Sequence, residues 1–331
     1  MRKIVLYGLF NPEVVKMFRS ALGDTFDIVE VTDEQDYSQL KDAEYIVNRV
    51  FYMRADLFEQ ASCLKMVQKW GAGYEKVDIK AAAKYGIPVV NCIGINAGPV
   101  AELTVLLMLA ALRKLIPQVE ALKEGQWLRD EYAKTTRMLR GKQVGIIGFG
   151  RIGQAVSEIV SSGFGAKVMY YDAYRQPEEK EMELGVKYAD LETLLVTSDI
   201  VTIHIPLSKN TEKMINAELL AKMKKNAILV NTARGQIVDE EALIEALRNG
   251  VIAGAALDTY EQEPLQADSP LLKMENVIAT PHCGGNTADN DEKMVKCCVD
   301  SILRFDAGIM PVAAQFVNQN EIDQYRKGMR I

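Results

Sequence analysis

Histidine and regularly spaced cysteine are what this chain lacks most clearly. It has two histidines and five cysteines in 331 residues, and no cysteine stands in a CxxC pair or at a Cys/His ligand spacing. Structural metal sites use such spacings, so we expect no metal centre. The odd number of cysteines does not suggest a disulfide framework, and reduced thiols are typical of a cytoplasmic protein. The cysteines are Cys63, Cys92, Cys283, Cys297 and Cys298.

Long apolar runs are also absent. The most apolar stretch, VAELTVLLMLAAL from Val100, contains Glu102 and is shorter than the roughly 20 residues that span a bilayer. It predicts a buried helix. At the N-terminus, MRKIVLYGLFNPEVV has only a short apolar run before glycine and proline, unlike the apolar core of a signal peptide. We therefore expect neither a membrane segment nor a secretory leader.

A surplus of positive charge is the third missing feature. The net charge of −6 gives no broad basic surface for a phosphate backbone, which argues against nucleic acid as a partner. What the chain does have is material for a core, since 48% of its residues are hydrophobic and 25% are charged. That balance is typical of a folded soluble protein, and the length of 331 residues suggests two domains.

Short β-branched runs alternate with helical patterns along the whole chain, which indicates parallel βαβ units. Five strand candidates precede the apolar helix and about six follow it, so we expect two doubly wound α/β sheets. The crossing between them is expected near residue 100, and the last helical stretch, DNDEKMVKCCVDSILRF, should pack back toward the first lobe. The strand candidates are KIVLY, FDIVEV, EYIVNR, KMVQKW and IPVVN, then KQVGIIG, AKVMYYD, IVTIHIP, NAILVNTA, AGAALD and VIATP.

A GxGxxG pattern in VGIIGFGRIG follows one of these strands and opens a helix. In that context Gly148 permits the tight turn, Gly150 lets backbone approach a pyrophosphate, and Gly153 lets the helix pack close to its strand. The next strand ends in Asp172, 19 positions after the last glycine, where a carboxylate meets a ribose 2′-hydroxyl. Because this acid would repel a 2′-phosphate, we predict NAD rather than NADP. Arg175, close by in the sequence, is the one residue that weakens the predicted preference for NAD over NADP.

Polar residues follow several strands of the second half at their carboxyl ends, the edge where such sheets bind ligands. Arg234 comes after AILVNTA and before a glycine, which suits a guanidinium that docks a carboxylate. His282 stands between a proline and CGG, a segment with room for a ligand, and Glu263 of DTYEQEP is within reach of a neighbouring strand. For His204, in TIHIPL, a structural and a functional role are equally open.

The ordered set of motifs resembles the D-isomer-specific 2-hydroxyacid dehydrogenase family. The resemblance rests on KWGAGYEKVD, GIPVVN, VAELTVLLMLA, GFGRIG, HIPLSKNT, LVNTARGQIVDEEAL, ALDTYEQEP and TPHCGG. It implies a discontinuous, flavodoxin-like substrate-binding domain, residues 1–99 plus 288–331, with a Rossmann NAD-binding domain, residues 100–287, inserted in it. The sequence departs from the common family pattern at Cys283, Thr259 and Tyr260, outside the polar catalytic set.

The resemblance also implies roles for individual residues. His282 would be the acid/base, Glu263 would hold its imidazole and favour the charged form, and Arg234 would bind the substrate carboxylate. The backbone of Gly71, Ala72 and Gly73 would add donors from the first lobe, and closure between the lobes would expel water. Cofactor contacts are implied for Gly148, Gly150, Arg151, Ile152, Gly153, Asp172, His204, Pro206, Thr211, Thr232, Ala233, Arg234, Asp258, His282 and Gly284.

The substrate is the least determined part of the prediction. A small 2-oxo acid such as glyoxylate or hydroxypyruvate is favoured, 3-phosphoglycerate dehydrogenase is the alternative, and an NADH-sensing corepressor-like binding protein is the less favoured third. The direction of the reaction, the strictness of NAD over NADP and a redox role for Cys283 stay open. The helix after Val100 and the KEGQW arm resemble the family's dimer contact, so we expect a homodimer.

Overall fold

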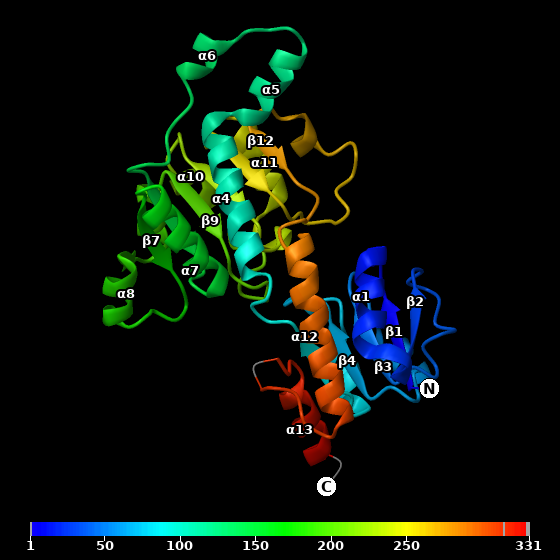
Figure 1. The fold of residues 1–331 in the computed structure, drawn as a ribbon. Coiled ribbons are helices and arrows are strands. Elements are labelled where there is room, and N and C mark those ends of the chain that lie inside the picture. The colour runs from blue at the N-terminus through cyan, green and yellow to red at the C-terminus, as the bar shows by residue number, and fades with distance from the viewer. Residues whose placement is uncertain (1, 314, 329–331) are drawn as a thin grey trace. The chain divides into compact units, whose positions relative to one another are not determined.

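The computed structural model describes residues 2–313 and 315–328 of the chain. The chain divides into two compact units: unit 1 runs to Asn96 and resumes at Asn286, and unit 2 is Ala97–Gly285. The predicted domain boundaries, at residues 99/100 and 287/288, lie within three residues of these divisions. Each unit is an α/β structure of its own, coloured along the chain in Figure 1.

Unit 1 is built on a five-stranded parallel sheet with the order β2-β1-β3-β4-β5. This is the flavodoxin-like order, and each of the five strands predicted for the first half is present. Its strands are β1 (Arg2–Tyr7), β2 (Phe26–Val31), β3 (Tyr45–Asn48), β4 (Met66–Lys69) and β5 (Val89–Asn91). Its helices are α1 (Pro12–Leu22), α2 (Ala55–Gln60), α3 (Ile79–Lys84), α12 (Ala288–Asp306) and α13 (Gln319–Gly328).

Helix α12 brings the end of the chain back to unit 1, where it packs beside α1 (Figure 1). The Thr287 side chain caps this helix by accepting a hydrogen bond from the Asn290 amide. Its apolar residues recur at helical spacing, so Val295 and Ile302 join Phe18 of α1 in one buried cluster. The opposite, polar face of α12 is left for other contacts.

Unit 2 contains a seven-stranded parallel sheet with the order β12-β11-β10-β9-β6-β7-β8. Read in chain order, this is the Rossmann arrangement with one strand added at an edge. The strands are β6 (Gln143–Ile147), β7 (Lys167–Tyr171), β8 (Val186–Tyr188), β9 (Ile200–Ile203), β10 (Ile228–Asn231), β11 (Gly254–Leu257) and β12 (Val277–Ala279). The estimate of about six strands omitted β8, because its three residues, Val-Lys-Tyr, do not form an apolar run like those of the predicted strands.

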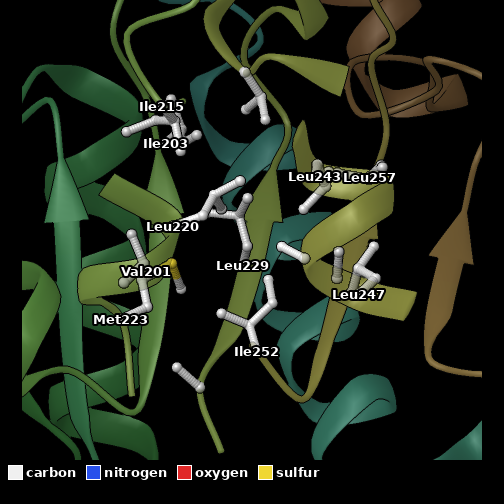
Figure 2. Packing of buried hydrophobic residues seen from close by; sticks show 14 of the residues in the cluster. Val201, Ile203, Ile215, Leu220, Met223, Leu229, Leu243, Leu247, Ile252 and Leu257 are labelled. Carbon is white, nitrogen blue, oxygen red and sulfur yellow. The ribbon is translucent and has the colours of Figure 1, made fainter. Parts of the chain in front are cut away.

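The helices of unit 2 bury the apolar faces of this sheet. Figure 2 shows Leu229 of β10 between Val201 of the neighbouring strand and Leu247 of a covering helix, all in one buried cluster. The apolar run after Val100 is helical as predicted, and no helix among the described residues is long and apolar enough to cross a membrane. The helices are α4 (Ala97–Arg113), α5 (Leu115–Lys123), α6 (Arg129–Ala133), α7 (Arg151–Glu158), α8 (Glu178–Leu184), α9 (Leu191–Thr197), α10 (Ala217–Lys222) and α11 (Glu240–Arg248).

Candidate active site

The glycine fingerprint forms the turn between β6 and α7. Gly148 has a φ of +96°, and a Cβ there would lie 2.6 Å from the carbonyl carbon of His204. A Cβ on Gly153 would lie 2.2 Å from the Gly148 oxygen, so the helix packs directly on the turn. A Cβ on Gly150 would meet nothing within 4 Å. Two glycines thus close the turn, while the third leaves open space beside it.

The open space lies at the N-terminus of α7, whose cap residue is Gly150 and which no side chain caps. Unsatisfied amide groups and the positive end of the helix dipole at such a terminus favour an anion. Arg151 is exposed in the first turn, and Ile152 is half-buried beside it. The local backbone therefore fits the pyrophosphate of a dinucleotide.

Asp172 follows β7 and faces this turn. One of its carboxylate oxygens accepts a 2.7 Å hydrogen bond from the Phe149 amide, and the other accepts from the Tyr174 amide at 2.9 Å. Arg175 is turned to a different partner, because its Nε and Nη2 each donate to a Glu181 carboxylate oxygen at 2.9 Å. That bond to Arg175 lowers the pKa of Glu181 to about 2, so the pair stays charged.

His204 ends β9 beside the fingerprint. Its Nε2 lies 2.9 Å from the Thr202 hydroxyl oxygen, whereas its Nδ1 is buried and has no partner among the described residues. Burial lowers the pKa of His204 to about 3, so the imidazole is neutral at physiological pH. An unpartnered buried ring nitrogen here is an observation in favour of a ligand contact. In the loop that follows, Thr211 donates to the Pro206 carbonyl at 2.8 Å and holds the loop closed.

Arg234 sits in a turn after β10 that Asn231 organises. The Asn231 side chain donates to the Arg234 carbonyl at 2.9 Å and accepts from the Ala233 amide at 3.0 Å. The next residue is Gly235, where a Cβ would lie 1.8 Å from the carbonyl carbon of Tyr260. Only glycine allows this approach, which brings the arginine turn against the segment that carries Glu263.

Thr232 belongs to the same turn and is buried. Its hydroxyl lies 2.8 Å from that of Thr104 in α4, and Thr104 donates its own proton to the Val100 carbonyl at 2.7 Å. Because the Thr104 proton is already used, Thr232 donates to Thr104. The apolar helix after residue 100 therefore also fixes the turn before Arg234.

His282 and Glu263 form a direct pair. The His282 Nδ1 lies 2.7 Å from a Glu263 carboxylate oxygen, while the other carboxylate oxygen accepts from the Tyr260 amide at 3.2 Å. Burial raises the pKa of the Glu263 carboxyl, but the hydrogen bond and charge of His282, with a contribution from the positive charge of Arg234, outweigh it and hold the pKa below its usual range. The three predicted catalytic side chains thus belong to one electrostatic cluster in unit 2.

Asp258, which is 1% exposed, fixes the backbone of the segment that carries His282. One Asp258 oxygen accepts from the Thr280 hydroxyl at 2.5 Å and from the Cys283 amide at 2.9 Å. The other accepts from the Gly284 amide at 2.8 Å. His282 itself has a φ of +50°, a conformation that few residues other than glycine, asparagine, aspartate and histidine tolerate.

Gly71, Ala72 and Gly73 lie in unit 1, after β4. The Gly71 carbonyl accepts from the Cys92 amide at 3.0 Å, and the Ala72 carbonyl accepts from the Asn91 side chain at 2.7 Å. Both carbonyls point into unit 1. Their proposed role toward a substrate stays a prediction, as do the individual cofactor contacts in unit 2.

Sequence reasoning did not find two residues that shape the site. Asn231 is 1% exposed and fixes the arginine turn, and an asparagine at the end of an apolar strand is the signal that marks such turns. Tyr260 was noted only as a departure from a family pattern. Its hydroxyl donates to the carbonyls of Leu257 and Thr280 at 3.1 and 2.7 Å, joining the Glu263 and His282 segments.

A parallel sheet in Rossmann order, a glycine turn at an uncapped helix N-terminus, and a histidine–glutamate pair in one electrostatic cluster with an arginine are features expected of an NAD-dependent oxidoreductase. Comparison with known proteins agrees. Residues 105–284 match the model of the D-isomer specific 2-hydroxyacid dehydrogenase NAD-binding domain. The chain belongs to the D-isomer specific 2-hydroxyacid dehydrogenase family, and it is an enzyme that uses NAD to act on 2-hydroxy acids.

Several relatives are similar over most of the chain. A glyoxylate reductase of Korarchaeum cryptofilum is 41% identical over 81% of this chain and 80% of its own length. A D-3-phosphoglycerate dehydrogenase of Methanocaldococcus jannaschii is 37% identical over 99% of this chain and 62% of its own length. The structure of Aquifex aeolicus D-lactate dehydrogenase with NAD and lactic acid has a TM-score of 0.84 and 30% identity, covering 95% of this chain and 99% of that one.

Proposed function

We propose that the protein reduces a small 2-oxo acid, glyoxylate or hydroxypyruvate, to the corresponding (R)-2-hydroxy acid, reversibly and with NADH as the hydride donor. The observation that carries the proposal is the 2.7 Å pair of His282 and Glu263 next to Arg234. An imidazole held by a carboxylate is a proton donor and acceptor, and a guanidinium is a carboxylate receptor. A 2-oxo acid presents the two groups that this set recognises.

His282 is the proposed acid/base. Because its Nδ1 is bonded to Glu263, its Nε2 is the nitrogen left to meet the substrate oxygen. In reduction, Nε2 donates its proton to the keto oxygen while hydride reaches the carbonyl carbon. In oxidation, the neutral Nε2 accepts the hydroxyl proton. The ionised Glu263 stabilises the imidazolium, and its lowered pKa keeps it ionised well into the acid range.

Arg234 is the proposed carboxylate clamp. Its Nη1 donates to the neighbouring Ala233 carbonyl at 2.7 Å, which orients the guanidinium plane at the end of β10. A planar fork of this kind binds a carboxylate through two parallel hydrogen bonds. The same positive charge, next to the carbonyl of the 2-oxo acid, polarises that carbonyl toward hydride attack.

The decisive experiment measures the decay of NADH absorbance with glyoxylate, hydroxypyruvate, pyruvate, phosphohydroxypyruvate and a bulky 2-oxo acid. The highest kcat/KM with glyoxylate or hydroxypyruvate supports the proposal. Each assay is repeated with the His282→Ala protein, because turnover retained near the wild-type level at neutral pH would rule out the acid/base role of His282. Tight NADH binding without turnover of any acid contradicts the proposal.

Phosphohydroxypyruvate defines the second candidate function, 3-phosphoglycerate dehydrogenase. What favours it is that the match with the Methanocaldococcus jannaschii D-3-phosphoglycerate dehydrogenase covers 99% of this chain. A phosphorylated substrate needs cationic groups in addition to Arg234. A kcat/KM for phosphohydroxypyruvate above that for glyoxylate and hydroxypyruvate selects this function.

We also propose that the enzyme is a homodimer. Large apolar side chains on α4, α5 and the following arm are exposed, including Leu122 at 58% and Trp127 at 78%. Several large apolar side chains exposed on consecutive elements favour an interface, because an extended apolar surface is uncommon on a monomer. The side chains are Leu106, Leu115, Ile116, Val119, Leu122 and Trp127.

A further inference from the structure

A cavity in unit 1 is lined by none of the residues assigned a catalytic or cofactor role. It has a volume of about 510 Å³, within the range of pockets that bind small molecules. One wall is the polar face of α12, and the other is formed by Pro311, Val312 and Gln315. Figure 1 shows α12 in orange. Ile95 and Gly94, which follow β5, contribute to the same lining.

The helical wall is positively charged. Lys293, Lys296 and Arg304 recur at spacings of three and eight residues, which places them on one face of α12 with Asp300 as the one acid in the lining. No salt bridge pairs any of these three cations with a carboxylate within residues 2–313 and 315–328. The chain as a whole has a net charge of −6, so this face opposes the average charge of the protein.

The rest of the lining is apolar. Ile95, Pro311 and Val312 contribute aliphatic surface, and Val312 is 52% exposed. Cys297 also faces the cavity, half-buried, and its sulfur accepts a 3.7 Å hydrogen bond from the Gln315 side chain. Exposed aliphatic surface beside unpaired cations favours a ligand that satisfies both.

We propose that this cavity is a binding site for a small amphiphilic organic anion, with its carboxylate or phosphate head on Lys293, Lys296 and Arg304 and its apolar body against Ile95, Pro311 and Val312. A bare inorganic anion would leave the aliphatic wall exposed to water. A neutral apolar molecule would leave three cations without a counter-charge. The lining contains none of the residues proposed to bind NAD or the 2-oxo acid, so the proposal does not depend on the proposed substrate.

The test is isothermal titration of the full-length protein, saturated with NADH, with decanoate and decyl phosphate. Saturation keeps the dinucleotide site from accepting the probes. We expect one molecule to bind per chain. Decanol, which lacks the anionic head, and acetate, which lacks the apolar body, should each bind at least about tenfold more weakly. Preference for decyl phosphate or for decanoate identifies the head group. Absence of binding by both anions overturns the proposal.

Variants locate the site. Reversing two charges, in Lys296→Glu/Arg304→Glu, should weaken binding of the preferred anion by about tenfold or more, because two attractions become repulsions. Val312→Ser should weaken decanoate binding by removing aliphatic surface, while it leaves the charge of the lining unchanged. Lys80→Glu is the matched control, since Lys80 is an exposed lysine on α3 of the same unit, outside the cavity. Equal loss in the control, or unchanged affinity in the double variant, overturns the assignment.

Discussion

Replacing His282 by asparagine separates chemistry from folding. His282 has a φ of +50°, and asparagine is one of the few residues that accepts this conformation, so the variant avoids backbone strain. The imidazole is 47% exposed and its recorded partner is Glu263. An exposed ion pair of this kind contributes about 1 kcal/mol or less to stability, so the variant should stay folded.

Loss of an acid/base group typically lowers turnover by about 10² to 10⁴-fold, which corresponds to about 2.7 to 5.4 kcal/mol of transition-state stabilisation. We expect a fall in kcat within that range for the preferred 2-oxo acid, with an NADH dissociation constant within about threefold of the wild type. His204→Gln is the matched control, because it changes the other histidine of the chain, which is already neutral. It should change NADH affinity more than kcat.

The assay combines steady-state NADH oxidation, a fluorescence titration with NADH and a thermal melt on the same preparations. A kcat for His282→Asn within tenfold of the wild type, with the fold intact, refutes the acid/base assignment. A large fall in the melting temperature would mean that the loss of kcat comes from unfolding. In that case the Glu263→Gln protein tests the acid/base assignment instead. It keeps the imidazole and removes only the charge next to it, so its kcat should also fall.

Three further outcomes are expected. Arg234→Lys should lower kcat and raise KM for the 2-oxo acid, about tenfold or more in kcat/KM, because one point charge replaces a bidentate fork; an unchanged KM argues against the clamp. Glu181→Gln should free Arg175 and raise NADPH affinity severalfold in a fluorescence titration, and unchanged affinity would mean that Arg175 does not reach the 2′-phosphate. Leu122→Glu should shift sedimentation toward a monomer, whereas a monomeric wild type removes the dimer proposal.

The fold was accessible from the sequence because its strands are nearly continuous apolar runs. Such runs are what a parallel sheet covered on both faces requires, and each one bounded by polar turns predicts a strand. The glycine spacing around Gly148 was equally informative, since the structure gives Gly148 and Gly153 physical reasons to lack a side chain. The flavodoxin-like and Rossmann arrangements of the strands were expected from the family resemblance rather than from any single strand.

Other features of the fold and site could not be predicted, because they depend on contacts between residues that a local sequence pattern does not show. Strand β8 is a three-residue edge strand defined by its pairing with β7 rather than by its own alternation. Arg175 appeared from spacing alone to be a neighbour of the ribose site, but its guanidinium is bonded to Glu181 six residues later. The hydrogen bond between His204 and Thr202 likewise joins two residues whose exposure and partners the sequence does not show.

The polar residues at the carboxyl edge of the unit 2 sheet form two groups: those whose side chains bind the protein backbone, and those whose side chains stay exposed. Asp258 and Asn231 are each 1% exposed and spend their side-chain atoms on the backbone of the His282 and Arg234 segments. His282, in contrast, binds Glu263 through one ring nitrogen and keeps 47% of its side chain exposed. A residue can meet a substrate only with atoms that the protein has not already used. The buried aspartate and asparagine therefore hold the backbone of the site, and the exposed histidine keeps one ring nitrogen for the proposed proton transfer.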